Sequence, residues 1–177
     1  MKFKTVLNDV ITFSNNLGFD IVIKNDIDDF FKGDLDGKTI YLINLDDEEK
    51  LFNVLHLVGH CIQWNLSEEL RILGNSIYEN PSDDLLCKLQ NYEWEANCYG
   101  LFILNQLGYG YLKNWLEKKF EIDLLYLTHF YKTGEKSRKI SEISKKYVFQ
   151  KTLIVKEIPK IKIKSQKMTR NGIVINF

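Results

Sequence analysis

Two of the three histidines, His56 and His60, lie four residues apart within Leu51–Trp64, a stretch that is otherwise mostly apolar. On an α-helix this spacing places both imidazoles on one face, one turn apart. Two such histidines and a third protein ligand can hold a zinc ion with one position open for water. In the usual motif of this kind, His-Glu-x-x-His, the glutamate is the general base. Leu57 stands in that position here, so the sequence predicts a metal site without its usual base.

A carboxylate further along the chain is the candidate third ligand. Residues 82–107 have the apolar spacing of a helix, which Ser82 would cap and Gly108 would end. Glu93 is the one charged residue in the apolar stripe of this helix, whereas Glu95 falls on the opposite face. Because a buried carboxylate is costly unless it is paired or bound to metal, we expect His56, His60 and Glu93 to bind a metal ion, with Zn²⁺ as the expected ion.

Simpler interpretations of these residues remain open. The two histidines would then be hydrogen-bonded side chains in a polar cleft, or a relic site that no longer holds metal. Glu93 would then pair with a lysine or arginine of the basic C-terminal region. His129 is an ordinary helix histidine, a fourth ligand or an oxyanion stabiliser. Cys61 and Cys98 are expected to be small buried apolar residues, not ligands.

The predicted elements give an α+β fold with a helical core, a small N-terminal sheet and a β-rich C-terminal extension. The Asp36-Gly37 pair predicts a hairpin turn, and Asp46 with Glu49 predicts the start of the helix that carries the histidines. Predicted helices are residues 3–17, 46–64, 68–73, 82–107, 111–120 and 123–131, and predicted strands are 20–24, one beginning near 30–33, 38–43, 147–155, 158–164 and 172–177.

The charges of the chain are divided unevenly. Net charge is zero over 177 residues, but residues 131–177 hold 13 Lys/Arg and 3 Asp/Glu. We therefore predict a domain over residues 1–130 and a basic extension over 131–177. The extension is either a surface for nucleic acid or an acidic partner, or a set of edge strands protected by lysine. The absence of a helix-turn-helix or aromatic stacking motif favours protected strands or a protein partner over nucleic acid.

The sequence has no apolar run long enough to span a membrane and no signal-peptide pattern at its start. Its three cysteines lack CxxC spacing, which is typical of reduced thiols. We expect a cytoplasmic protein that does not insert into membranes.

The motifs follow one another in a definite order: strand, Asp-Gly turn, strand, acidic helix start, His56-Leu57-Val58-Gly59-His60 and Glu93-Trp94-Glu95-Ala96-Asn97-Cys98-Tyr99-Gly100. This order resembles that of the ImmA/IrrE family of zinc-dependent endopeptidases. The resemblance covers roughly residues 28–107. It implies a zincin-like fold, His56, His60 and Glu93 as zinc ligands, and a peptide substrate. Family members are often encoded by mobile elements and cleave a repressor. The chain departs from the family pattern at Leu57, which replaces the catalytic glutamate, and in its C-terminal third.

Three functions follow as hypotheses. The first is a zinc-binding protein derived from such a metallopeptidase, with hydrolysis impaired or altered because leucine cannot accept a proton. Glu49, Glu95 or a C-terminal residue would be a substitute base, although spacing places none of them. The second is a catalytically inactive module that binds a protein, such as a regulator or a phage or host defence factor. The third is a metal-dependent enzyme of another reaction type, since such ligand sets also suit non-haem iron.

Overall fold

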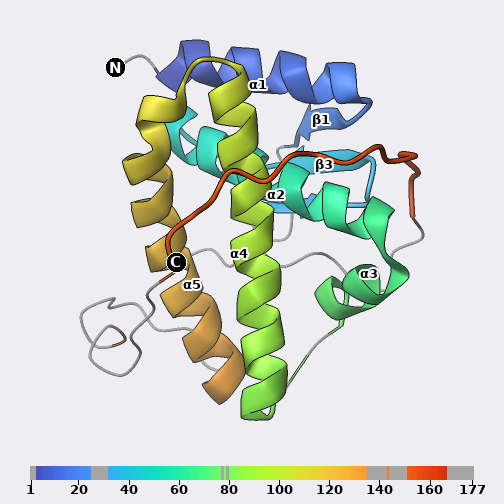
Figure 1. Cartoon of the computed structure of the whole chain (residues 1–177), viewed down its shortest axis with the longest axis vertical. Coiled ribbons are helices and arrows are strands. Elements are labelled where there is room, and N and C mark those ends of the chain that lie inside the picture. The colour runs from blue at the N-terminus through green and yellow to red at the C-terminus, as the bar shows by residue number, and fades with distance from the viewer. Residues whose placement is uncertain are drawn as a thin grey trace.

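The computed structural model describes residues 3–24, 32–76, 78, 80–134, 143 and 151–166. These residues form an α+β fold, as the sequence predicts, in which a three-stranded sheet packs against α1 and α2 at one side of a helical body (Figure 1). In chain order the elements are α1 (Phe3–Leu17), β1 (Asp20–Ile23), β2 (Gly33–Leu35), β3 (Thr39–Leu42), α2 (Asp47–Leu66), α3 (Glu68–Gly74), α4 (Asp83–Gln106), the 3₁₀ turn η1 (Gly110–Leu112) and α5 (Lys113–Thr133).

The sheet has the order β1-β3-β2, with β3 in its centre. β1 is parallel to β3, and β2 is antiparallel to it. The predicted hairpin turn is present between β2 and β3: the backbone N–H of Asp36 donates to Thr39 O at 3.0 Å, and Gly37 has a φ of 87°. The Asp36 carboxylate also accepts from the N–H groups of Lys38 and Thr39. An aspartate that closes the turn and a glycine that tolerates positive φ together fix the register of the hairpin.

Helix α2 begins where the acidic segment predicts. Asp46 is its N-cap, because the carboxylate accepts from the N–H of Glu49 at 2.9 Å. Every residue from Leu51 to Trp64 is buried, so α2 is surrounded by protein on all sides. The polar face of α2 packs inside the molecule against α4, with His60 at the border of a small cavity.

Helices α2 and α4 approach each other very closely at one point. A Cβ atom built on Gly59 would lie 2.2 Å from the backbone oxygen of Ala96. Only glycine permits this contact. The close approach brings the histidine-bearing turns of α2 next to the turn of α4 that carries Glu93.

Helix α5 differs from the prediction of two short helices at 111–120 and 123–131. It is one continuous helix from Lys113 to Thr133. The buried residues Leu116, Phe120 and Leu124 follow one another at intervals of four along a single face. The connection at Glu121-Ile122 contains no glycine or proline, so nothing in the sequence interrupts the helix there.

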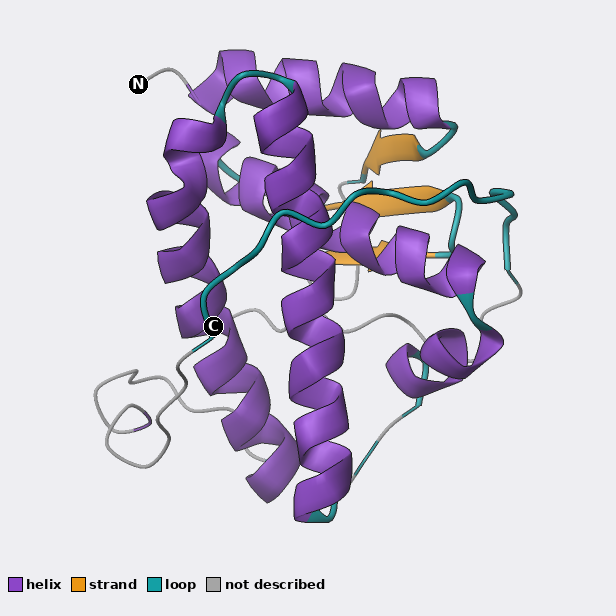
Figure 2. Cartoon of the chain, viewed as in Figure 1, coloured by secondary structure: helices purple, strands orange, loops and turns teal. Residues whose placement is uncertain are grey.

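The C-terminal segment also differs from the prediction. Residues 151–166 form no strand and cross over α4 and α2 as an extended chain (Figures 1 and 2). Leu153 is fully buried, and Ile158, Ile161 and Ile163 pack against the core. The alternation of isoleucine and lysine therefore reflects one side packed on the core, not a strand within the described sheet. The rest of the predicted strands, at 147–150 and 172–177, lies outside the described residues.

The remaining predicted elements are confirmed. Ser82 caps α4, with its hydroxyl accepting from Leu85 N at 3.3 Å, and Gly108 follows the helix end with a φ of 79°. Cys61 and Cys98 are buried, as expected, and Cys87 is exposed. No helix within the described ranges has both the length and the apolar character needed to cross a membrane.

Candidate metal centre

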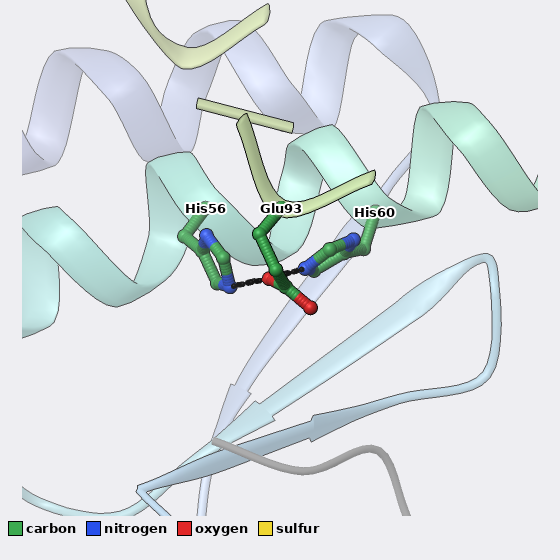
Figure 3. Close-up of side chains that lie close together, drawn as sticks. All are labelled: His56, His60 and Glu93. Atoms are coloured by element: carbon green, nitrogen blue, oxygen red, sulfur yellow. Dashed lines mark hydrogen bonds and ion pairs between the residues drawn. The ribbon is translucent and has the colours of Figure 1, made fainter. Parts of the chain in front are cut away.

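The three predicted ligands meet in the interior of the molecule. His56 and His60 project from successive turns of α2, and Glu93 reaches between them from α4 (Figure 3). The side chains are 3%, 8% and 7% exposed. Nε2 of His60 lies 3.0 Å from Nε2 of His56 and 3.1 Å from Oε2 of Glu93, and the remaining separation, between His56 Nε2 and Oε2, is 3.4 Å.

These separations suit three ligands of one ion. Zinc bonds of about 2.0–2.1 Å to nitrogen and oxygen, at tetrahedral angles, place neighbouring donor atoms about 3.3 Å apart. The observed values lie around this separation. The donor set of two imidazoles and one carboxylate is also one that zinc accepts at open catalytic sites. The residues therefore fit a zinc ion in both geometry and chemistry.

The orientation of His60 is fixed by the amide of Gln63. Nε2 of Gln63 donates to the backbone oxygen of Tyr92 at 2.9 Å and to the carboxylate of Glu95 at 2.8 Å. The Gln63 oxygen must then face Nδ1 of His60, 2.8 Å away, and accept its proton. With its proton on Nδ1, a neutral His60 would present the lone pair of Nε2 to the point between Glu93 and His56, and this is the tautomer that binds metal.

Asn97 contacts Nδ1 of His56, the ring nitrogen that does not meet Glu93. The Asn97 amide lies 2.9 Å from Nδ1 of His56, and its other polar atom, Oδ1, has no hydrogen-bond partner within the described part of the chain. Metal binding through Nε2 of His56 requires a proton on Nδ1. Turning the amide over would place Oδ1 where it accepts that proton, but would give up the bond from Nδ2 of Asn97 to the backbone oxygen of Glu93 at 3.0 Å.

Burial and mutual charge set the protonation of the site. Burial, and then the neighbouring His60, lower the pKa of His56 from 6.5 to about 3, so its imidazole is neutral at pH 7. Burial alone would raise the pKa of Glu93, but the charge of His60 and a hydrogen bond from it, then the charge of His56 and a hydrogen bond from Tyr131, outweigh it and lower that pKa. A neutral imidazole beside an ionised carboxylate is the state a cation requires.

Aromatic side chains hold the two imidazoles in place. His60 stacks on Tyr92, with ring centroids 4.5 Å apart, and His56 stacks on Phe52 at 5.8 Å. A cavity of about 40 Å³ opens beside His60 and Glu93, which is room for a few water molecules. Its walls include Leu57 and three tyrosines: Tyr78, Tyr92 and Tyr131. The cavity gives a small group access to the side of the triad that faces Tyr131.

Leu57 occupies the place expected for the general base. It is 2% exposed, lines the same cavity as His60 and Glu93, and packs beneath Gly33 of β2, where a Cβ atom would lie 2.7 Å from its Cδ1. The position is therefore next to the triad, but its side chain is entirely apolar.

The residues considered as substitute bases are engaged elsewhere. Glu49 accepts from Lys32 at 2.8 Å and from Lys119 at 2.6 Å. Glu95 was expected on the face opposite the site, but it bonds Gln63 and pairs with Lys156 of the C-terminal segment. The described C-terminal lysine near the site thus pairs with Glu95, whereas Glu93 contacts the histidines. His129 is buried on α5, outside the triad.

Asp123 is a buried acid near the site that the sequence analysis missed. It lies on α5 and is 9% exposed. Burial, and then the charge of Glu93, raise the pKa of Asp123 from 3.8 to about 7, although Lys32 and His60 act to lower it. The sequence predicts two helices, 111–120 and 123–131, and therefore places Asp123 at a helix start. In the single helix α5 it lies on the buried face. Asp123 is therefore a second carboxyl group within the electrostatic range of the triad.

This shift makes the stability of the metal-free protein depend on pH. Between pH 4 and pH 7 the folded state keeps the Asp123 proton and the unfolded chain loses it, so this residue lowers the free energy of unfolding as pH rises, by up to about 4 kcal/mol. His56 acts in the opposite direction over the same range, because only the unfolded chain is protonated there. The two contributions oppose each other, so the pH dependence of wild-type stability alone does not separate them.

Asp123→Asn isolates the contribution of Asp123. Urea unfolding of wild type and variant in EDTA should show the variant gaining stability relative to wild type from pH 4 to pH 7, with no further gain above pH 8. Asp83→Asn, at an exposed position of α4, serves as the control and should show no such trend. A stability difference between Asp123→Asn and wild type that is constant with pH would contradict the raised pKa.

Comparison with known proteins adds no relative: no family model, curated protein or solved structure matches the chain.

Proposed function

We propose that the chain binds one divalent metal ion, Zn²⁺, through His56, His60 and Glu93. The observation that carries this proposal is the convergence of three donor atoms within 3.4 Å inside the core. The lone pair of His60 is directed at the same point by a hydrogen-bonded amide. A site with this geometry, a neutral His56 and an ionised carboxylate is suited to a cation.

We further propose that this centre descends from a zincin-type metallopeptidase of the ImmA/IrrE kind. Bound zinc would lower the pKa of a water molecule and polarise a substrate carbonyl. Leu57 cannot take a proton from that water, so we expect hydrolysis by the natural chain to be weak. Tyr131, which donates to Glu93 and lines the cavity, and Asp123 are the neighbouring groups able to hold a proton.

A peptide is the substrate class that the surroundings support. β2 borders the cavity through Leu35 and lies at the edge of the described sheet. The bonds of Asp36 to Thr39 and of Lys32 to Ile43 mark the hydrogen-bonded pairs of the hairpin. The backbone groups of Gly33 and Leu35 between them therefore point away from β3, and of these the Leu35 N–H already donates to the Asp34 carboxylate at 2.7 Å. An extended peptide can pair with such an edge beside the metal.

Leu57→Glu tests the peptidase ancestry. The new carboxylate would stand beside the triad, and we expect zinc-loaded Leu57→Glu to cleave denatured casein or a mixed fluorogenic peptide library about 10²–10⁴-fold faster than wild type. Leu57→Gln is the matched control, with nearly the same shape and no basic oxygen. Equal rates for the two zinc-loaded variants would remove the support for a lost peptidase base.

The alternative of an inactive protein-binding module is favoured by the same leucine, which is fully buried at the position of the base. In that case metal would serve structure, not hydrolysis. His56→Ala would then reduce stability but leave binding of the partner protein by the folded protein unchanged. Loss of both partner binding and metal in a folded His56→Ala protein would argue against a metal-independent module.

A further inference from the structure

A continuous chain of polar contacts joins the C-terminal segment to a proposed metal ligand. Lys156 of this segment forms an ion pair with Glu95 of α4. The other oxygen of Glu95 accepts from Nε2 of Gln63 at 2.8 Å, and Oε1 of Gln63 lies 2.8 Å from Nδ1 of His60. Residues more than ninety positions apart in the sequence are thus linked by three successive contacts.

The donors and acceptors of these contacts fix the orientation of the Gln63 amide. The Gln63 side chain is completely buried, and its NH₂ group has two acceptors, Glu95 and the Tyr92 carbonyl. These acceptors leave only the amide oxygen for His60, which keeps the Nδ1 proton in place. If Glu95 turned away, one of the two acceptors that set the orientation of Gln63 would be lost. An amide facing His60 with its NH₂ group would favour the tautomer whose Nε2 carries a proton and cannot bind metal.

Lys156 holds Glu95 in this position. The Glu95 side chain is 22% exposed and the Lys156 side chain 39% exposed, so the pair lies at the boundary of the core. Burial acts to lower the pKa of Lys156, but the hydrogen bond and charge of Glu95 outweigh it, and that pKa is raised. The ammonium also lies 5.3 Å from the ring centroid of Tyr99. Lys156 is therefore a cation at neutral pH with two partners on α4.

The segment that carries Lys156 is fastened on both sides of it. Before Lys156, the backbone N–H of Leu153 donates to Glu117 at 2.9 Å and Trp94 donates to the carbonyl of Thr152 at 3.2 Å. After it, the N–H of Lys164 donates to the Asn65 side chain at 2.8 Å. The position of Lys156 over Glu95 is thus set by the packing of the whole segment.

We propose that Gln63, Glu95 and Lys156 are positioning residues for His60, through which the C-terminal segment 151–166 sets the affinity of the metal centre. This inference rests on the proposed metal site. Loss of an outer-shell partner of a ligating histidine typically lowers metal affinity 10–100-fold. Gln63, in direct contact with His60, should show an effect of this size, and Lys156, two contacts further away, a smaller one.

The test measures zinc affinity by competition with a chromogenic chelator and records the visible absorption spectrum of the Co²⁺-substituted protein. Gln63→Met should weaken zinc binding about 10–100-fold. Lys156→Met should weaken it about 3–10-fold, on the same basis. Lys160→Met and Lys162→Met, which remove exposed lysines of the same segment, are matched controls and should change affinity less than about 2-fold, as single exposed charges do. A shift of the Co²⁺ bands in Gln63→Met and Lys156→Met alone would show altered coordination in a folded protein.

The double variant separates positioning from general destabilisation. If Lys156 acts through Gln63, Lys156→Met should have no further effect on zinc affinity in the Gln63→Met background. Equal effects of Lys156→Met in both backgrounds, or zinc affinities and Co²⁺ spectra unchanged in both single variants, would overturn the inference while leaving a zinc-binding wild type intact. A wild type that binds no zinc would overturn the proposed metal site and this inference with it.

Discussion

Glu93→Gln should lower the affinity for zinc by more than about 100-fold, since a direct ligand matters more than the outer-shell partners whose loss typically costs 10–100-fold. The substitution keeps the volume of the side chain and removes its charge. The amide offers zinc a weaker, neutral oxygen beside His56 and His60. Zinc competition assays and elemental analysis of the purified variant measure this change directly.

The same substitution should leave the metal-free fold intact. Glu93 is buried as a carboxylate and needs a cation or shared protons to balance its charge. Glutamine keeps the shape of the side chain but loses the contacts that lower the pKa of Glu93, so we expect a protein that still folds in EDTA with a lower melting temperature than wild type. Glu121→Gln, at an exposed position of α5, is the control and should change neither property. Wild-type zinc affinity in Glu93→Gln would mean that the carboxylate is not a ligand.

Gly59→Ala destabilises the protein by about 3 kcal/mol or more, at the upper end of the range for inserting a methyl group into a packed core. The new Cβ would lie 2.2 Å from the backbone oxygen of Ala96 and 2.6 Å from its carbonyl carbon. Backbone atoms inside two helices cannot rotate aside, so α2 and α4 must separate. Chemical denaturation of the metal-free variant measures the loss, and zinc affinity should fall because Glu93 moves away from His60.

Gly100→Ala is the matched control for this effect. It places a methyl group in the same α2–α4 contact, but its Cβ would lie 3.2 Å from Cβ of Leu55 and 3.4 Å from the Leu55 backbone oxygen, which a small shift of the helices can accommodate. Alanine also favours a helix over glycine by about 1 kcal/mol. We expect Gly100→Ala to be close to wild type in stability and zinc affinity. If Gly59→Ala were equally mild, the close approach of the two helices would be wrong.

The three residues of the triad could be predicted from sequence because each is recognised from the pattern of its own helix. The four-residue spacing of His56 and His60 is a property of one helix, and Glu93 is a charge in the apolar stripe of another. The N-cap at Asp46 and the turn at Gly37 depend on neighbouring residues in the same way. These features require no knowledge of how the helices pack.

The surroundings of the triad could not be predicted, because they depend on tertiary packing. Glu95 was placed on the opposite face of its helix, yet the C-terminal segment and Gln63 reach it there. Asp123 was missed because a break was predicted between residues 120 and 123, where the structure has one continuous helix. The isoleucines of 158–164 have strand-like alternation, but an extended chain lying on helices buries every second residue just as a strand does.

Zinc binding by the wild-type protein, purified without an affinity tag or chelator, is the most direct test of the metal centre. Elemental analysis followed by titration with zinc at pH 7.5 should give one ion per chain, and that ion should be absent from Glu93→Ala prepared in parallel. A wild type that holds no metal as purified and takes up none in excess zinc would contradict the account, and His56, His60 and Glu93 would then be a hydrogen-bonded cluster of the core.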